Sequence, residues 1–176
     1  LTLLYRLLFI FYAEARDLLP LRTNKTYREV YSLHAAVRVA AGHSDEGVLP
    51  LNETTGMWGK LKDLFRIIDG GSPPLGVATF NGGLFDPTGH PFLEQYKVGD
   101  GHLQRALDQL ARVGGEFIDY RDLAERHLGT IYEGLLEHTL QRLPEPIFPQ
   151  GVRWTVDLFN DKGERHRTGS YYTPDD

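Results

Sequence analysis

The chain has 176 residues, of which 41% are hydrophobic and 24% charged, with a formal net charge of −5. These proportions are ordinary for a water-soluble globular protein with one core, and they exclude a low-complexity or highly charged disordered chain. The chain contains no Cys, which excludes a disulfide framework or a thiolate zinc site and fits a reducing compartment such as the cytoplasm.

The first twenty residues predict a core helix that is already under way at residue 1. Charges at Arg6 and from Glu14 onward interrupt its apolar run, which is shorter than the roughly 20 residues of a membrane span. The segment also lacks the basic start and the small-residue cleavage site of a signal peptide. We therefore expect this end, like the other, to be a cut through a longer protein. The apolar stripe of the helix consists of Leu4, Leu8, Phe11, Ala15 and Leu18.

Two further helices are expected between residues 26 and 71. Thr26 and Glu29 form a capping-box pattern at the start of the first, and Gly42 is typical of a helix end. The second helix begins near Trp58 and carries an apolar residue at every third or fourth position until two glycines end it.

Residues 72–99 are expected to form an irregular loop, because Gly or Pro recurs every few positions from residue 72 onward. This pattern rules out a helix in the Gly- and Pro-rich stretch and favours short extended pieces. We expect Phe80, Leu84 and Phe85 to anchor the loop to the core, since they are its large apolar residues.

Two stretches of this loop have chemical interpretations besides a plain structural one. Ser72, Pro73 and Pro74 resemble the Pro-Pro element with which amino-methyltransferases hold a flipped base, but the Leu that follows cannot stack on a base. The loop also contains Asp86, Glu94 and Lys97, which loosely resemble a metal-dependent nuclease site. In the usual signature the last acid and the Lys are two apart, whereas here they are three apart. We favour the structural interpretation for both stretches.

The last two predicted helices begin at Asp100 and Asp119. Asp100 is expected to cap the first of them, and the Gly pair at 114–115 is expected to stop it. The second is predicted to continue, with its own apolar stripe, until Pro144 ends it.

A β-hairpin is predicted at the C-terminal end. Apolar residues alternate with polar ones from Val152 to Leu158, a turn is expected at 160–163, and residues 164–172 can return as a second strand. The predicted fold is therefore mainly α, with a bundle of about five helices over residues 1–150. A small hairpin occupies residues 151–176.

Charge is distributed unevenly along the chain. Residues 45–150 carry nine basic and sixteen acidic side chains, and clustered Lys and Arg are what bind DNA phosphates. The central helices are therefore poor candidates for a DNA surface. The best basic cluster lies beside the predicted turn, where a solvated turn is the alternative interpretation. Its candidate DNA-binding residues are Lys162, Arg165 and Arg167. The seven His residues show no metal-binding spacing.

Three segments occur in an order that is typical of one enzyme family. They are FNGGLFDP at 80–87, IDYRDLAERHLGTIYEGLLEHTL at 118–140 and RHRTGSYYTPDD at 165–176. Together they resemble the region just upstream of the catalytic domain in large adenine-specific DNA methyltransferases, above all the restriction-modification enzymes of type IIG. The resemblance implies that residues 1–150 are a helical connector. It implies that residues 151–176 lead into a truncated methyltransferase domain.

The resemblance also implies a cofactor and a reaction for the parent enzyme. The parent would transfer a methyl group from S-adenosylmethionine to the exocyclic amine of a flipped adenine in double-stranded DNA. GSYYTP resembles the start of the motif that precedes the S-adenosylmethionine fold, and free N–H groups at a helix N-terminus suit the methionine carboxylate. An ordinary helix start is the alternative. The implied cofactor contacts are Gly169, Tyr171, Tyr172, Thr173 and Pro174.

The residues that would perform this chemistry are not found in the chain. The glycine-bearing cofactor loop and the Asn-Pro-Pro-aromatic element of the family are expected after residue 176, and no upstream nuclease signature is seen. We therefore expect the chain alone to bind no cofactor tightly and to be inactive. Its expected partner is the missing methyltransferase domain of the same chain. No association with a membrane is expected. The alternatives are a non-enzymatic helical interaction module and a self-contained nuclease using Asp86 and Glu94.

Overall fold

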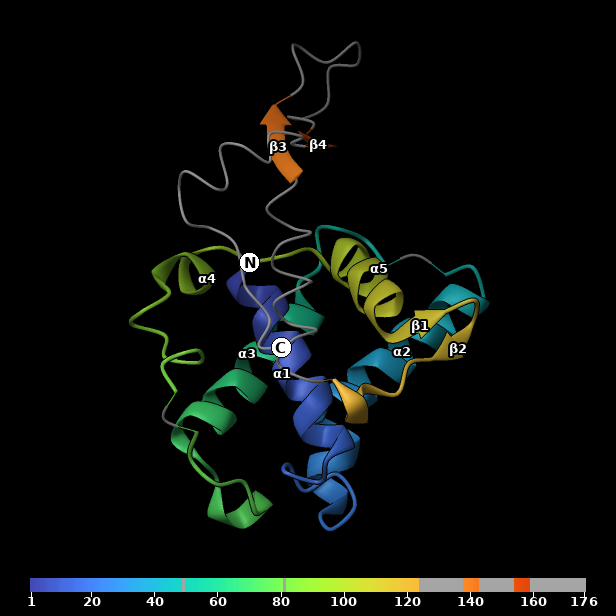
Figure 1. Cartoon of the computed structure of the whole chain (residues 1–176). Helices are drawn as coiled ribbons and strands as arrows, with labels where there is room; N and C mark the ends of the chain where they lie inside the picture. The colour runs from blue at the N-terminus through green and yellow to red at the C-terminus, as the bar shows by residue number, and fades with distance from the viewer. Residues whose placement is uncertain (49, 81, 124–137, 143–153, 159–176) are drawn as a thin grey trace, which may run out of the picture. The chain divides into compact units, whose positions relative to one another are not determined.

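The computed structural model describes residues 1–48, 50–80, 82–123, 138–142 and 154–158, the last two ranges by their backbone. The chain forms two compact units, Leu1–Asp122 and Leu123–Asp176. The first unit is helical, and the described part of the second is a two-stranded antiparallel sheet (Figure 1). The predicted mainly α fold with about five helices and a small hairpin is confirmed. The α-helices of the first unit are α1 (Thr2–Ala15), α2 (Leu33–Asp45), α3 (Gly56–Gly70), α4 (Pro91–Gln95) and α5 (Asp100–Ala111).

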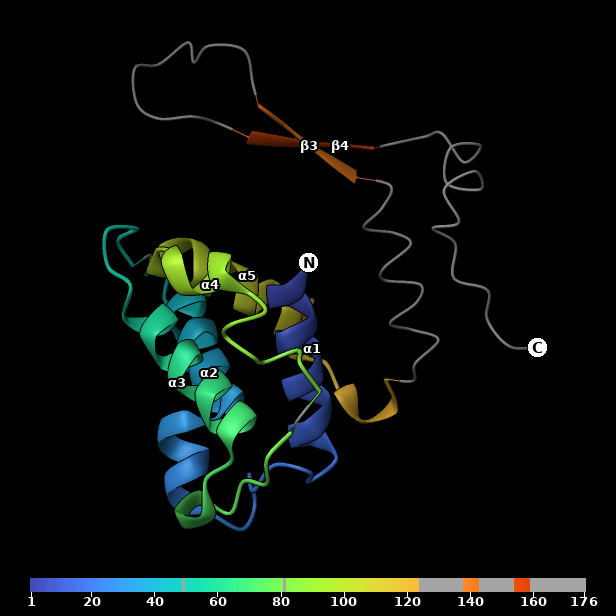
Figure 2. The ribbon, with the colours of Figure 1, turned by 90° about the vertical axis from the view of Figure 1, so that its left-hand side faces the viewer.

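The core of the helical unit lies between α1, α2, α3 and α5. α1 contacts α2, and α2 packs along α5 and against α3, as the two ribbon views show (Figures 1 and 2). Burial of the apolar stripes of these helices is the main force that holds them together. No helix in the described part of the chain is long and apolar enough to cross a membrane. Large core residues include Ile10, Trp58, Leu64, Leu103 and Leu107.

The predicted start of the second helix, at Thr26, is wrong. Residues 27–31 form a π-helical turn, η1 (Tyr27–Tyr31), and the chain then breaks at Ser32, whose backbone is extended. The Ser32 hydroxyl accepts a hydrogen bond of 3.0 Å from the Ala35 N–H, so Ser32 is the N-cap of α2. Thr26 forms no side-chain cap. The predicted capping box is therefore wrong, and the N-cap is Ser32, six residues further on.

Asp100 caps a helix, but the helix is α3 and not α5 as predicted. Its two carboxylate oxygens accept hydrogen bonds of 3.0 Å from the Gly56 N–H and 2.8 Å from the Met57 N–H. These are free donors at the positive end of α3. α5 begins at Asp100 with Gly99 as its N-cap residue. A single carboxylate thus ties the starts of two helices together.

The loop between α3 and α5 is irregular, as predicted, with two exceptions. It contains a 3₁₀ turn, η2 (Pro73–Leu75), and the short helix α4, so the prediction that this stretch forms no helix is wrong there. Pro73 and Pro91 stand at the first positions of these turns, which their fixed φ favours. A loop rich in Pro can therefore still contain single helical turns.

The predicted anchoring of this loop by its apolar residues is confirmed. Phe85 is 3% exposed, and its ring lies 5.4 Å from that of Phe9 and 5.8 Å from that of Phe65. Phe80 makes an edge contact with Phe9 at 5.5 Å, and Leu84 packs against the same core. Edge-to-face geometry of this kind adds to the hydrophobic gain of burial.

After α5 the chain turns at the predicted glycines. Gly114 and Gly115 have φ values of +62° and +88°, which suit the tight turn between β1 (Arg112–Val113) and β2 (Glu116–Phe117). Where a helix is predicted from Asp119, the described residues up to 123 form a 3₁₀ turn, η3 (Tyr120–Asp122), and residues 124–137 lie outside the described residues.

The end of that predicted helix is wrong, because residues 138–142 form strand β3 (His138–Arg142). It pairs antiparallel with β4 (Trp154–Leu158), with Leu140 opposite Val156. The strand predicted around Trp154 is therefore confirmed, but its partner precedes it. Alternation identifies a strand without identifying what pairs with it. The predicted return strand at 164–172 and the predicted boundary at residue 150 lie outside the described residues.

Replacing Gly99 by Ala is expected to lower the free energy of unfolding by about 2 kcal/mol, as overpacking of a rigid site does. A Cβ at Gly99 would lie 2.2 Å from the Asn52 carbonyl oxygen, which is backbone and cannot turn away. Urea denaturation followed by circular dichroism measures the change. Gly59→Ala is the control, because its Cβ would lie in open space on α3, and it is expected to stabilise slightly. Equal effects of the two substitutions would contradict the prediction.

Candidate functional site

The residues that the sequence assigns to cofactor and DNA lie outside the described residues. Their assignment stays a prediction. They are the cofactor residues Gly169, Tyr171, Tyr172, Thr173 and Pro174 and the DNA-binding residues Lys162, Arg165 and Arg167.

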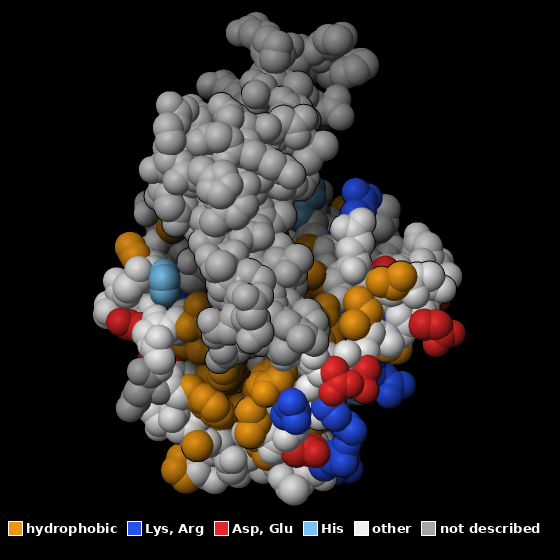
Figure 3. All heavy atoms as spheres, viewed as in Figure 1, with side chains coloured by type: hydrophobic (Ala, Val, Ile, Leu, Met, Phe, Trp, Pro, Cys, Tyr) orange, Lys and Arg blue, Asp and Glu red, His pale blue; other side chains and the backbone are white. Residues whose placement is uncertain are grey.

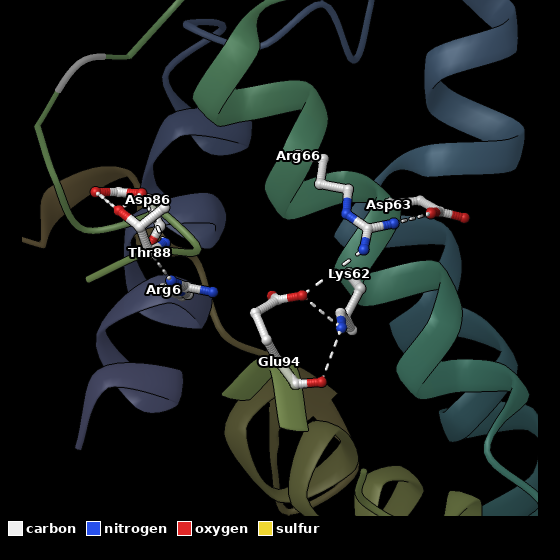
Figure 4. Close-up of polar contacts among 7 residues, drawn as sticks. All are labelled: Arg6, Lys62, Asp63, Arg66, Asp86, Thr88 and Glu94. Carbon is white, nitrogen blue, oxygen red and sulfur yellow. Dashed lines mark hydrogen bonds and ion pairs between the residues drawn. The ribbon is translucent and has the colours of Figure 1, made fainter. Parts of the chain in front are cut away.

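The carboxylate of Asp86 is used by its own loop. It accepts hydrogen bonds of 2.8 Å from the N–H and from the hydroxyl of Thr88 (Figure 4). These bonds favour the ionised form and hold the pKa of Asp86 below its usual range. Asp86 therefore acts as a turn residue in the described structure.

The carboxylate of Glu94 turns to two cations of α3 and away from Asp86 (Figure 4). Lys62 Nζ lies 2.6 Å and an Arg66 nitrogen 3.7 Å from Glu94 Oε2. The Lys62 hydrogen bond is the main cause that lowers the pKa of Glu94, and the charges of Lys62 and Arg66 add to it. Among the described residues, no group of His, Asp or Glu could hold a metal ion. The Asp86 and Glu94 pair of the nuclease alternative is thus not brought together.

The Pro-Pro stretch forms a surface turn. Pro73 and Pro74 are exposed, whereas Leu75 packs against the core. The side-chain amide of Asn24 donates a 3.3 Å hydrogen bond to the Pro74 carbonyl. This contact fits the structural interpretation of the stretch.

Arg6 is a buried cation, although in the sequence it stands out only as an interruption of an apolar run. It is 1% exposed, and its guanidinium lies 5.0 Å from the Phe65 ring and 5.6 Å from the Phe85 ring. Its Nε donates a 2.8 Å hydrogen bond to the Leu84 carbonyl, and a longer one of 3.5 Å reaches the Asp86 carbonyl. Burial lowers the pKa of Arg6. Arg6 therefore fastens the loop after α3 to α1.

Glu14 is a buried carboxyl on the same helix. It is 5% exposed, and Oε1 accepts hydrogen bonds of 2.9 Å from the Tyr27 hydroxyl and 2.8 Å from the Leu33 N–H. Oε2 accepts one of 2.9 Å from the His34 N–H. Glu14 thereby joins α1 to the free donors at the start of α2. This contact helps to explain why α2 begins at Leu33 and not at Thr26.

Burial determines the ionisation of this site. It raises the pKa of Glu14 to about 7, although the three hydrogen bonds act in the opposite direction. Burial and the neighbouring carboxylate together raise the pKa of the Tyr27 phenol. Burial, with the charge of Arg38, lowers the pKa of His34. Glu14 has no ion-pair partner in the described part of the chain.

A cavity of about 280 Å³ adjoins Glu14. Phe11 and Tyr120 form one side of it, with their rings stacked at 4.6 Å and nearly parallel. His34 and Phe117 also line it. An apolar cavity with a single buried carboxyl is an arrangement that can receive a small ligand.

Comparison of the chain with protein-family models, with curated proteins and with solved structures gave no match.

Proposed function

We propose that this chain is the helical connector of a type II restriction-modification DNA adenine N6-methyltransferase, inactive without the catalytic domain. The observation that carries the proposal is the order of two motifs, LGTIYEGLLE at 128–137 and RTGSYYTP at 167–174. Either motif alone is a weak signal, and the combination is fairly specific. In this proposal the connector holds the catalytic domain in place, and its last residues support the cofactor pocket.

The contacts of the helical unit support a positioning role. Three of its buried charged side chains, Arg6, Glu14 and Asp100, each bind the backbone of another element. Buried charges that are hydrogen-bonded in this way specify one arrangement of helices. Rigidity of this kind is what a connector between two functional parts requires.

The proposal assigns the other expected partners to the parent enzyme. S-adenosylmethionine would lie beside Tyr172, Thr173 and Pro174, because the helix start predicted there would suit its carboxylate. Double-stranded DNA would contact the basic residues around Arg165. The parent enzyme would act in the cytoplasm, where its DNA substrate is.

A non-enzymatic interaction module is the second candidate function. Val113 and Phe117 of the short β1–β2 hairpin are 71% and 58% exposed. Hydrophobic side chains gather beside charged ones on the face of the molecule drawn in Figure 3. Exposed apolar patches of this kind are typical of contacts between proteins.

The coding sequence after Asp176 distinguishes these two functions. We expect it to encode a glycine-bearing loop and, further on, an Asn-Pro-Pro-aromatic element. A stop codon directly after Asp176 would contradict the methyltransferase proposal and favour the interaction module.

Calorimetric titration provides the biochemical test. Residues 1–176 are expected to bind S-adenosylmethionine weakly or not at all, whereas the protein extended through the downstream domain binds it stoichiometrically. In the extended protein, Tyr172→Ala is expected to weaken binding. The control, Tyr96→Ala, removes an exposed tyrosine of the helical unit and should leave binding unchanged. Tight stoichiometric binding by residues 1–176 alone would overturn the inactive-connector proposal.

A further inference from the structure

We propose that the cavity beside Glu14 binds a small organic ammonium ion with an aromatic or alkyl body, whose positive end pairs with the Glu14 carboxylate. The inference rests on the cavity, on its apolar walls and on the buried Glu14 carboxyl, which has no ion-pair partner among the described residues and is ionised above pH 7. It does not depend on the proposed connector function.

The walls of the cavity suit an apolar body of modest size. Phe11 and Tyr120 present stacked rings, and Val37 and Phe117 add further apolar surface. The volume of about 280 Å³ is near the lower end for small-molecule sites. Phe117 and Ile118 are 58% and 38% exposed, so the cavity meets solvent at these residues.

The charge inside the cavity selects the sign of the ligand. Glu14 accepts three hydrogen bonds, and a carboxylate offers about four acceptor positions, so one remains for a further donor. A cation beside a buried carboxylate gains more than it would in water, because the surroundings screen the charge poorly. The aromatic rings add attraction for an ammonium group.

The other charged groups near the cavity are of both signs, and only Glu14 is a buried charged group among its lining residues. Asp119 is an exposed lining residue and adds negative charge. Two cations also lie nearby: the Nε of Arg121 donates a 3.3 Å hydrogen bond to the carbonyl of Ala15, a lining residue, and the charge of Arg38 acts on His34. The lowered pKa of His34 keeps its imidazole neutral at neutral pH. An anion would meet two carboxylates, and a neutral ligand would gain only the apolar contacts.

Two ligands of similar shape test the proposal. 2-Phenylethylammonium and the neutral 2-phenylethanol are titrated into the ¹⁵N-labelled protein at pH 8, above the pKa of Glu14 of about 7, and amide shifts are followed by NMR. We expect the ammonium ion to bind about tenfold more tightly, the gain typical of a charge-assisted hydrogen bond. The largest shifts are expected at Leu33, His34 and Ile118.

Three variants locate the source of this preference. Glu14→Gln removes the charge and is expected to make the two affinities nearly equal. Glu94→Gln, which alters a carboxylate paired with Lys62, is the control and should keep the tenfold preference. Phe117→Ala should weaken both ligands, because it removes part of the apolar wall that both contact.

The outcomes that overturn the proposal are equally definite. They are equal affinity for the two ligands, shifts that cluster away from the cavity, or no saturable binding of the ammonium ion. A Glu14→Gln variant that keeps the preference would also overturn it. If thermal unfolding shows that Glu14→Gln does not fold, the ligand pair and Phe117→Ala on the otherwise unchanged protein decide the question.

Discussion

Replacing Arg6 by Ala is expected to lower the free energy of unfolding by about 4 kcal/mol, because it leaves a cavity and unpaired carbonyl groups. The side chain is 1% exposed and lies against the rings of Phe65 and Phe85. Its loss also frees the Leu84 carbonyl, which has the 2.8 Å hydrogen bond from Arg6. The loop after α3 should detach first, since Arg6 joins it to α1.

Urea denaturation followed by circular dichroism at 222 nm measures this change in the helical unit. Arg105→Ala is the matched control, because Arg105 is exposed on α5, and its effect should stay within about 0.5 kcal/mol. Arg6→Met retains apolar volume and should recover part of the loss. If Arg6→Ala costs no more than Arg105→Ala, the structural role assigned to Arg6 is wrong.

Glu14 is expected to make the stability of the protein fall as the pH rises from about 4.5 to about 7. The folded protein holds the pKa of Glu14 at about 7, above the ordinary value of 4.5. Below pH 4.5 the carboxyl is protonated in both states, so its favourable contribution is fully present. Between the two values the unfolded chain loses the proton while the folded protein keeps it. Above pH 7 no further change is expected from this group.

The size of this effect follows from the difference between the two pKa values. Each unit corresponds to about 1.4 kcal/mol, so Glu14 should contribute a loss of about 3 kcal/mol across this range. Other carboxyls titrate as well, and the stability of the unchanged protein must therefore be compared with that of Glu14→Gln at each pH. The difference between the two curves isolates Glu14.

Glu94→Gln is the control for this measurement and should give a flat difference from about pH 4.5 to pH 7, with a change of opposite sign only below pH 4.5. The pKa of Glu94 is lowered by Lys62, so its contribution is lost as the pH falls and not as it rises. If the stability curves of the unchanged protein and of Glu14→Gln run parallel from pH 4.5 to pH 7, the pKa of Glu14 is not raised in the folded protein.

Hydrophobic periodicity was sufficient to find most of the helices. The stripes of α3 and α5 recur every three or four residues, and helices with one apolar face bury that face wherever they pack. The stripe predicted for α1 was wrong in part, because the buried face runs through Leu7, Ile10 and Ala13, while Leu18 lies beyond the helix and is 54% exposed. The glycines after α5 were equally informative, because Gly114 and Gly115 adopt the positive φ that a tight turn requires. These signals are local and do not depend on the partner.

Caps and strand partners were predicted less well, because they depend on residues far apart in the chain. Thr26 has a suitable sequence for a cap, but Ser32 and the buried Glu14 carboxylate satisfy the donors of α2. Asp100 caps the start of α3, 44 positions from Gly56. Strand β4 pairs with residues that also have helical periodicity. No local pattern contains this information.

The sequence by itself determined the helical class of the protein and the motifs behind its proposed function, since periodicity and motif order are properties of the chain. Only the tertiary structure decided the roles of the two charged residues Arg6 and Glu14 in α1. Arg6 and Glu14 interrupt an apolar run, which the sequence alone explains by exposure to water. Both are buried, because carbonyl groups, aromatic rings and helix donors from distant segments surround them and replace the water that they lose.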